Sequence, residues 1–262
     1  MGNSRASWFT RGLTQSLLYV GRYAGYLSNI NGGYEVDGKQ YKLTPNAHGG
    51  KSTYNGGNRG WGRRDWDIPT HTKDSITFVM FDKKQNGFPG LFVSCLTHTV
   101  TANEWTIAYG VTPLLAPGPV NLAPQTYFNL DGMQTNATND ILNHQLYMPA
   151  AGFRFAMNEN SIPTGDLLSN KKGEKNEFWS GPRNIGDARK EGPLPPPWDE
   201  TYMLMHEHPQ DPMENPAAVL SSMKSGITME LYSNQDALHV HTWDQKNGEQ
   251  LPSPTLSQAC PC

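Results

Sequence analysis

Short strand-like segments, separated every few residues by glycine or proline, constrain most strongly what this chain can fold into. Its 262 residues include 26 glycines and 20 prolines. Both residue types interrupt helices and are typical of the turns between strands. No segment shows the apolar period of a long helix, and residues 1–19 are expected to be irregular. The sequence therefore predicts an all-β fold with many strands at short spacing.

The clearest strand pair is the stretch GGYEVDGKQYKLT. Tyr34 and Val36 alternate with polar residues, Asp37-Gly38 is a typical hairpin turn, and Tyr41 and Leu43 resume the alternation. A further strand is expected in DSITFVMFD. Two strands about a turn are expected in each of GLFVSCLTHTVTANEWTIAYGVTP, NHQLYMPAAGFRFAM and GITMELYSNQDALHVHTW.

Composition excludes several classes of partner. The chain is 36% hydrophobic, enough for a core, and its net charge is −3 with no long basic run, so neither nucleic acid nor an anionic membrane is expected as a partner. No stretch is long and apolar enough for a membrane span, and no signal peptide is evident, which predicts a cytoplasmic protein by default. Cys95, Cys260 and Cys262 form neither a disulfide framework nor a zinc spacing. No cofactor is expected.

The chain shows no linker that would divide it into two domains. Residues 20–252 are expected to form a single β domain, preceded by the irregular segment 1–19 and followed by a proline- and serine-rich tail, 253–262. Residues 171–199 are polar and then proline-rich, so they cannot form a central strand.

Several motifs, in order along the chain, resemble those of aldose 1-epimerases (galactose mutarotases), most closely the fungal-type members. They are VGRYAGYLSN, GGYEVDGKQYKLTPN, NAHGGKSTYNGGNRGWGRRDW, NGFPG, APQTYFNLDG, SIPTGDL and SNQDALHVHTW. The resemblance runs from about Val20 to about Pro252. It implies a galactose mutarotase-like β-supersandwich, in which large antiparallel sheets pack together and a concave face holds the sugar.

The resemblance also implies a fold truncated at both ends, because family members carry more strands before the first motif and after the last. Missing strands would leave sheet edges open, and open edges pair with other chains. A homodimer through such an edge is therefore expected.

In the family, a glutamate takes the proton of the anomeric hydroxyl and a histidine protonates the ring oxygen, while a second histidine, an arginine and an aspartate hold hydroxyls. The resemblance places Tyr26 at the arginine, Asn55 at the second histidine and Gln125 at the catalytic histidine. The spacing to Trp66 fixes the match of Asn55, so the upstream His48 is not counted as a site residue. Asp199 corresponds to the aspartate, and the glutamate has no counterpart.

Asn55 and Gln125 keep hydrogen-bonding capacity, but neither side chain titrates near neutral pH. The residues that shape the family's cleft are retained: Gly56, Gly57, Trp66, Tyr127, Phe128, Asn129, Pro163 and Gly165. The residues expected to bind a small-molecule or sugar ligand are Tyr26, Asn55, Trp66, Gln125, Tyr127, Asp199 and Trp243.

His239, His241 and Trp243 alternate along one expected strand, so they share one face of it. The resemblance puts this strand beside the cleft, which makes His239 and His241, together with Asp199, the candidate catalytic residues. Two alternatives stay open. The imidazoles could make structural hydrogen bonds, or they could begin a metal site, but spacing shows no third ligand, so no metal is predicted.

Three functions are compatible with these features. The leading hypothesis is an aldose 1-epimerase-like protein that lacks the usual His/Glu pair and binds, isomerises or cyclises a small cyclic molecule, as in fungal specialised-metabolite biosynthesis. The second is an active aldose 1-epimerase, an isomerase that interconverts the α and β anomers of hexoses. The third is a non-catalytic carbohydrate-binding protein, a pseudoenzyme.

Overall fold

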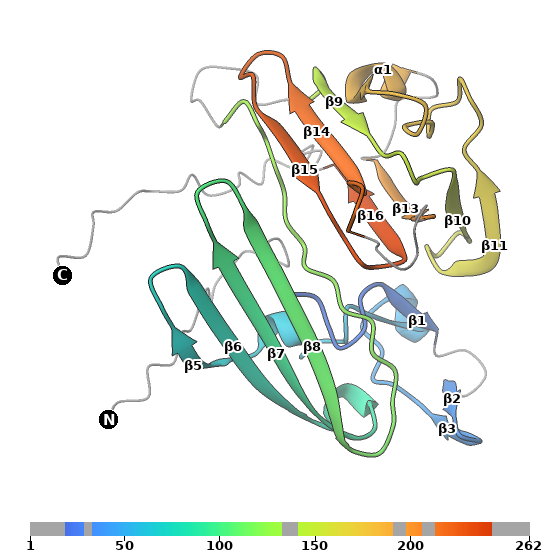
Figure 1. The fold of residues 1–262 in the computed structure, drawn as a ribbon. Helices are drawn as coiled ribbons and strands as arrows, with labels where there is room; N and C mark the ends of the chain where they lie inside the picture. The colour runs from blue at the N-terminus through green and yellow to red at the C-terminus, as the bar shows by residue number, and fades with distance from the viewer. Residues whose placement is uncertain (1–18, 29–32, 133–140, 191–197, 206–212, 243–262) are drawn as a thin grey trace. The chain divides into compact units, whose positions relative to one another are not determined.

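The computed structural model describes residues 19–28, 33–132, 141–190, 198–205 and 213–242, which gather into two compact units (Figure 1). The first unit contains the described residues up to Tyr127 together with Glu159–Ile162, and the second contains the others. Every pairing between labelled strands is antiparallel. In the described part of the chain, α1 (Ile185–Lys190) is the only α-helix. The all-β fold class is thus confirmed.

The first unit contains a four-stranded antiparallel meander, and two smaller strand pairs precede it along the chain. The meander has the order β5 (Asp67–His71), β6 (Ser75–Lys83), β7 (Leu91–Val100) and β8 (Trp105–Leu115). The smaller pairs are β1 (Tyr26–Ser28) with β4 (Ser52–Tyr54), and β2 (Tyr34–Val36) with β3 (Lys39–Tyr41). Among the described residues of this unit, 3-10 turns span His48–Gly50, Trp61–Arg63 and Gln85–Gly87.

Local sequence explains these elements well. Asp37 and Gly38 both have positive φ, +50° and +72°, as a two-residue hairpin turn between right-twisted strands requires. Strand β7 buries Phe92, Ser94 and Leu96 in strict alternation. The core of this unit gathers Tyr19, Trp61, Met80 and Leu96.

The second unit consists of two four-stranded sheets with a shared core. One sheet has the order β11 (Pro163–Ser169), β10 (Phe153–Met157), β13 (Asp199–Met203) and β16 (Ala237–His241). The other has the order β12 (Arg183–Asn184), β9 (His144–Tyr147), β14 (Ala218–Ser222) and β15 (Thr228–Leu231). Tyr202 from the first sheet and Leu146 and Ala218 from the second lie in one buried cluster, so apolar side chains join the two sheets.

Two segments expected to be hairpins form the expected strands but do not pair as expected. β9 and β10 lie in different sheets, and so do β15 and β16. The link from β9 to β10 carries Met148 and Ala151, both fully buried, so this chain segment passes through the core rather than turning at the surface. Burial in the link favours a crossing between sheets over a tight turn.

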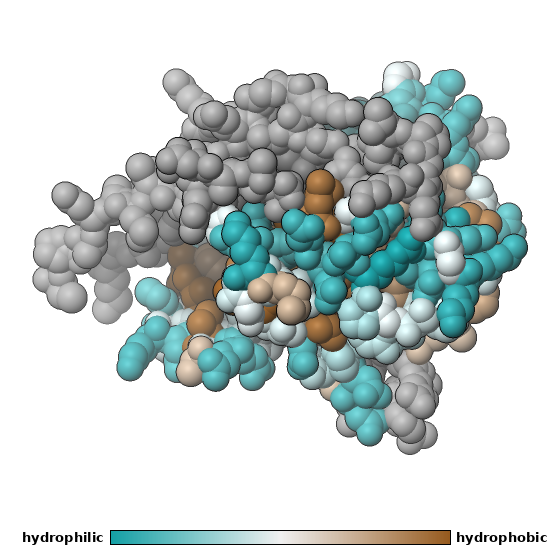
Figure 2. Space-filling view, turned by 90° about the horizontal axis from the view of Figure 1, so that it is seen from above, coloured by the Kyte–Doolittle hydropathy of each residue, from teal (hydrophilic) through white to brown (hydrophobic). Residues whose placement is uncertain are grey.

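The surface of the described residues carries both hydrophobic and hydrophilic side chains. On the face in Figure 2, hydrophobic side chains lie between hydrophilic ones among the coloured residues. The expected boundaries of a single domain at residues 20 and 252 stay a prediction, as does the homodimer. The segments 1–18 and 243–262 lie outside the described residues.

Candidate functional site

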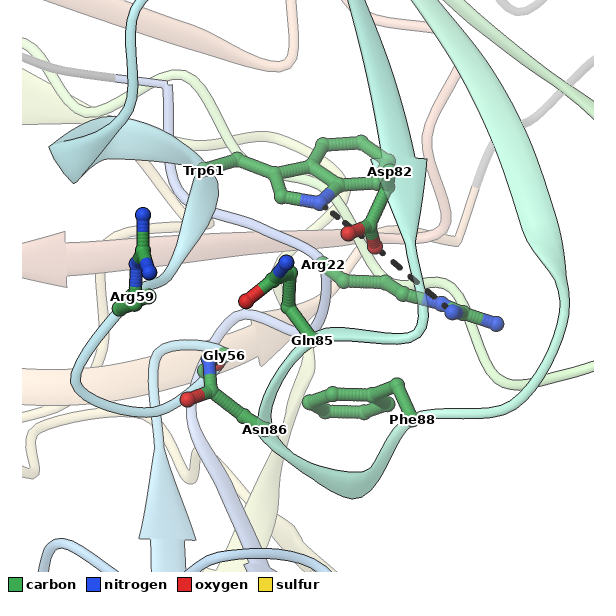
Figure 3. A pocket seen from close by; sticks show the side chains of 8 residues that line it. All are labelled: Arg22, Gly56, Arg59, Trp61, Asp82, Gln85, Asn86 and Phe88. Atoms are coloured by element: carbon green, nitrogen blue, oxygen red, sulfur yellow. Dashed lines mark hydrogen bonds and ion pairs between the residues drawn. The ribbon is translucent and has the colours of Figure 1, made fainter.

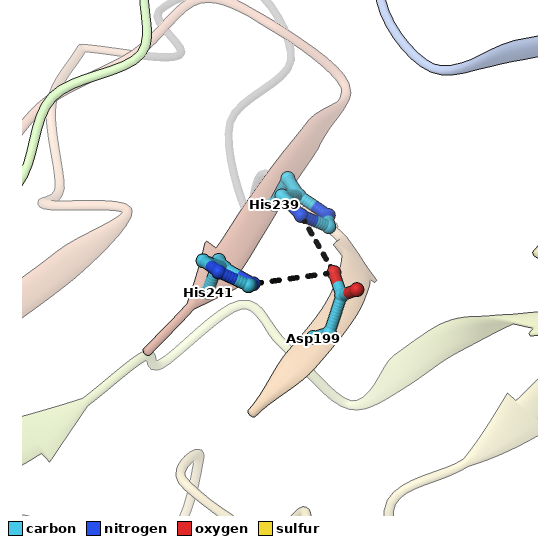
Figure 4. Close-up of side chains that lie close together, drawn as sticks. All are labelled: Asp199, His239 and His241. Carbon is cyan, nitrogen blue, oxygen red and sulfur yellow. Dashed lines mark ion pairs between the residues drawn. The ribbon is translucent and has the colours of Figure 1, made fainter. Parts of the chain in front are cut away.

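A carboxylate and two imidazoles meet on one face of the β13–β16 pair. Asp199 lies directly opposite His241, and Thr201 lies directly opposite His239. Successive side chains of a strand point to opposite faces, so Tyr202 turns into the core while Asp199 and Thr201 turn away from it. We call Asp199, His239 and His241 the Asp-His-His cluster (Figure 4).

The Asp199 carboxylate is the centre of this cluster. Its Oδ1 lies 3.0 Å from Nε2 of His239 and 3.7 Å from Nδ1 of His241. The two rings are nearly parallel, with an interplanar angle of 11° and centroids 6.4 Å apart. The His239 imidazole, and to a lesser degree that of His241, hold the pKa of the Asp199 carboxyl well below its usual range. Asp199 is therefore ionised at neutral pH.

The second nitrogen of His239 also has a partner. Nδ1 lies 2.9 Å from the Thr201 hydroxyl, which can donate or accept. This contact fixes the ring orientation from a neighbouring strand. His239 and Asp199 are more than half exposed, whereas the His241 side chain is 26% exposed, so the cluster is open to a ligand on one side. Trp243, expected on the same face, lies outside the described residues.

In the first unit, three segments that carry the family-like motifs lie side by side. Val20 pairs with Ala123, and Tyr26 of β1 pairs with Tyr54 of β4. The Tyr26 ring stacks on Tyr54 with centroids 4.3 Å apart. Asn55, at a φ of +49°, accepts a hydrogen bond from the Gly25 amide through Oδ1 at 2.9 Å. The Asn55 side chain therefore holds the backbone beside Tyr26.

The other predicted ligand-binding residues of this unit make similar structural contacts. Gln125 donates through Nε2 to the Tyr127 hydroxyl at 2.7 Å. Trp66 donates through its indole nitrogen to the carbonyl of Trp61 at 3.1 Å and packs against the core. The contacts of Gln125 and Trp66 are compatible with a binding role, which stays a prediction.

His48 is a titratable residue that the sequence analysis set aside. Its ring lies 4.7 Å from that of Tyr26, centroid to centroid, and its Nδ1 lies 3.0 Å from the Ser52 hydroxyl. The sequence signal was the HGG triplet at 48–50, which forms a 3-10 turn with positive φ at His48. That turn places the imidazole next to the Tyr26 ring, and no local sequence pattern predicts this contact.

A small depression in the first unit is lined by Arg22, Gly56, Arg59, Trp61, Asp82, Gln85, Asn86 and Phe88 (Figure 3). It encloses essentially no space that even a water-sized molecule could occupy, whereas typical ligand pockets hold roughly 300–1,000 Å³. Asp82 accepts hydrogen bonds from Trp61 at 3.0 Å and Arg64 at 2.7 Å, and it lies 3.7 Å from Arg22. These groups form a buried structural network rather than a binding site.

Comparison with known proteins identifies the family. The aldose 1-epimerase family model matches residues 8–260. The chain belongs to the aldose 1-epimerase family. The match extends beyond the range of about 20–252 expected from the individual motifs.

Relatives and solved structures agree with this family assignment. Epimerase FSL3 of Gibberella zeae is 44% identical over 251 residues, covering 87% of this chain and 57% of the relative. The aldose 1-epimerase of Escherichia coli is 32% identical over 152 residues, covering 57% and 41%. A GalM/aldose epimerase homologue from C. elegans superimposes with a TM-score of 0.71 at 27% identity, covering 84% of this chain and 63% of that one.

The galactose mutarotase-like fold is thereby confirmed. The chain spans about half the length of the curated relatives it matches, 57% of FSL3 and 41% of the E. coli protein. Within the described residues, no helix has the length and apolarity needed to cross a membrane.

Proposed function

We propose that this aldose 1-epimerase family member binds a small cyclic or sugar-like molecule and does not catalyse ordinary mutarotation. The observation that carries the proposal is the environment of Gln125. This residue stands where the family resemblance places the catalytic histidine, and its amide donates to Tyr127. A carboxamide has no titrating proton near neutral pH, so it cannot protonate a ring oxygen as a general acid does.

The other replaced residues of the first unit support the same proposal. The side-chain oxygen of Asn55 accepts a hydrogen bond from the Gly25 amide, and the Tyr26 ring stacks on Tyr54. Both residues stand where the resemblance places a sugar-binding cation or imidazole. Polar and aromatic surfaces remain for holding a ring, while Gln125 stands in place of the proton donor of mutarotation.

The Asp-His-His cluster is the proposed source of any proton transfer that remains. Imidazoles serve as general acids and bases near neutral pH, and an ionised carboxylate orients them. His239 and Asp199 are exposed enough to meet a ligand. Such a cluster suits isomerisation or ring closure of a reactive cyclic substrate. We extend the proposal to a step of this kind in fungal specialised metabolism, since the replacement of the proton donor and of two hydroxyl-binding residues favours a substrate other than a simple aldose.

Polarimetry tests the loss of mutarotation. With α-glucose and α-galactose, the full chain should leave the spontaneous rate of anomer exchange unchanged. The Gln125→His variant should also stay at that rate, because Asn55 and Tyr26 still stand in place of the family's second histidine and arginine. The E. coli aldose 1-epimerase serves as the positive control. Clear acceleration by the unaltered chain would instead make it an ordinary aldose 1-epimerase.

Ligand binding tests the role of the cluster. Saturation-transfer NMR with a panel of monosaccharides and cyclic polyols should identify a ligand of the full chain. The affinity for that ligand should fall about tenfold or more in His241→Phe, because a phenyl ring fills the space but can neither transfer a proton nor form the hydrogen bond. His71→Phe, at an exposed histidine of β5, is the matched control. Unfolding of His241→Phe, seen by circular dichroism, would assign this histidine a structural role and contradict the proposal.

A further inference from the structure

The Asp-His-His cluster presents three metal-binding groups within a small volume. Two neighbouring strands supply one carboxylate oxygen and two imidazole nitrogens, and these three atoms all lie within 4.8 Å of one another. We propose that the cluster binds a divalent transition-metal ion, for which Zn²⁺ is the best-matched species. The inference goes beyond the proposed function and does not depend on it, because ion binding is measured without any organic ligand.

The distances suit a tetrahedral ion. Two nitrogen or oxygen ligands bound to tetrahedral zinc at about 2.0–2.1 Å lie about 3.4 Å apart. The two separations from the Asp199 oxygen, 3.0 Å to Nε2 of His239 and 3.7 Å to Nδ1 of His241, bracket this value. All three donor atoms lie within 4.8 Å of one another, close enough to share one ion.

The contact to Thr201 is compatible with metal binding by His239. A metal-binding histidine normally donates its other ring N–H to a nearby oxygen, which fixes the tautomer. The Thr201 hydroxyl lies 2.9 Å from Nδ1 of His239, in position to accept that proton. With a cation bound at Nε2 of His239, the proton of the neutral ring would sit on Nδ1, facing the Thr201 hydroxyl.

The donor set also selects among ions. Imidazole nitrogens favour zinc and neighbouring transition metals, whereas Mg²⁺ and Ca²⁺ prefer sites made of oxygen. Three protein ligands leave at least one coordination position for another group. Asp199 and His239 are 56% and 54% exposed, so a hydroxyl or carbonyl oxygen from solvent can reach the cluster.

Isothermal titration of the full chain with ZnCl₂ tests the inference. The sequence also holds two closely spaced pairs of zinc-binding residue types, His206 with His208 and Cys260 with Cys262. The titration is therefore run in a background with both histidines changed to alanine and both cysteines to serine. One equivalent of Zn²⁺ should still bind there, while MgCl₂ should give no heat above dilution. Absence of zinc binding in this background overturns the proposal.

Variants of the cluster locate the ion. His239→Ala, His241→Ala and Asp199→Ala should each weaken zinc binding more than about 100-fold, and Thr201→Val, which removes only the orienting hydroxyl, should weaken it about 10-fold. His71→Ala, an exposed histidine of the other unit, should leave it unchanged. Undiminished binding in His239→Ala overturns the proposal.

Co²⁺ placed in the unaltered cluster gives a test that does not depend on how a variant folds. Paramagnetic broadening in the same background should centre on the amides of Thr201 and Val240, which lie within the two strands of the cluster. Broadening centred elsewhere overturns the proposal. Neither result bears on mutarotation, so failure of this inference and failure of the proposed function are distinguishable.

Discussion

Replacing Asp82 with asparagine should destabilise the first unit by about 3–5 kcal/mol. The change keeps the size of the side chain but removes its charge. Asp82 is 2% exposed and is the carboxylate beside the guanidinium of Arg22, which is 1% exposed. Removing one partner of a buried ion pair leaves the other charge uncompensated. Burial already lowers the pKa of Arg22, and the Asp82 carboxylate opposes that shift.

The loss of stability is measured by urea denaturation, monitored through hydrogen exchange at the backbone amides of β6 and β7. Both strands belong to the first unit, so their exchange reports on its unfolding. Asp67→Asn, an exposed aspartate on β5, is the control and should change stability by less than about 0.5 kcal/mol. Arg22 also donates to the carbonyls of Pro89 and Pro119 and lies over the Phe92 ring. A loss under about 1 kcal/mol in Asp82→Asn would show that these contacts alone compensate the guanidinium.

Replacing Gly56 with alanine should destabilise the same unit by about 2–5 kcal/mol, and Gly25→Ala by only about 1–2 kcal/mol. Both glycines have positive φ, +76° and +84°. A Cβ at Gly56 would lie 2.7 Å from the carbonyl carbon of Gly21 and from the amide nitrogen of Arg22, whereas one at Gly25 would meet nothing within 4 Å. The loss of unfolding free energy in Gly25→Ala therefore reports the strain of placing a side chain at positive φ. The additional loss in Gly56→Ala reports the steric clash of the new Cβ with the backbone of Gly21 and Arg22.

Thermal unfolding and the same exchange experiment give both values. The Gly21 carbonyl accepts a hydrogen bond from the Trp61 amide at 2.8 Å, so pushing it aside also disturbs the turn that carries the core tryptophan. Equal losses in the two variants would mean that the loop relaxes around the added methyl group, and that Gly56 is needed only for its φ.

The hairpin at Asp37-Gly38 and the strand containing His239 and His241 could be predicted because their information is local. A turn with two positive φ values needs particular residues at two adjacent positions, and strand alternation places i and i+2 on one face. The family resemblance placed Asp199 among the candidates in the same way, from a short motif. The predicted pairings of β9 with β10 and of β15 with β16 were wrong, because sheet membership depends on which faces become buried together.

The sequence by itself determined the all-β class, the family and the identity of the residues at each family-like position, since turn chemistry, alternation and motif order are all written in neighbouring residues. Only the tertiary structure decided that β13 lies beside β16 with Asp199 opposite His241, which turns two histidines with no evident third ligand into a three-donor cluster. It also decided that Gln125 and Asn55 are engaged by Tyr127 and Gly25. The physical reason is that contacts between residues distant in sequence are selected by the burial and register of whole sheets, and no local pattern records that outcome.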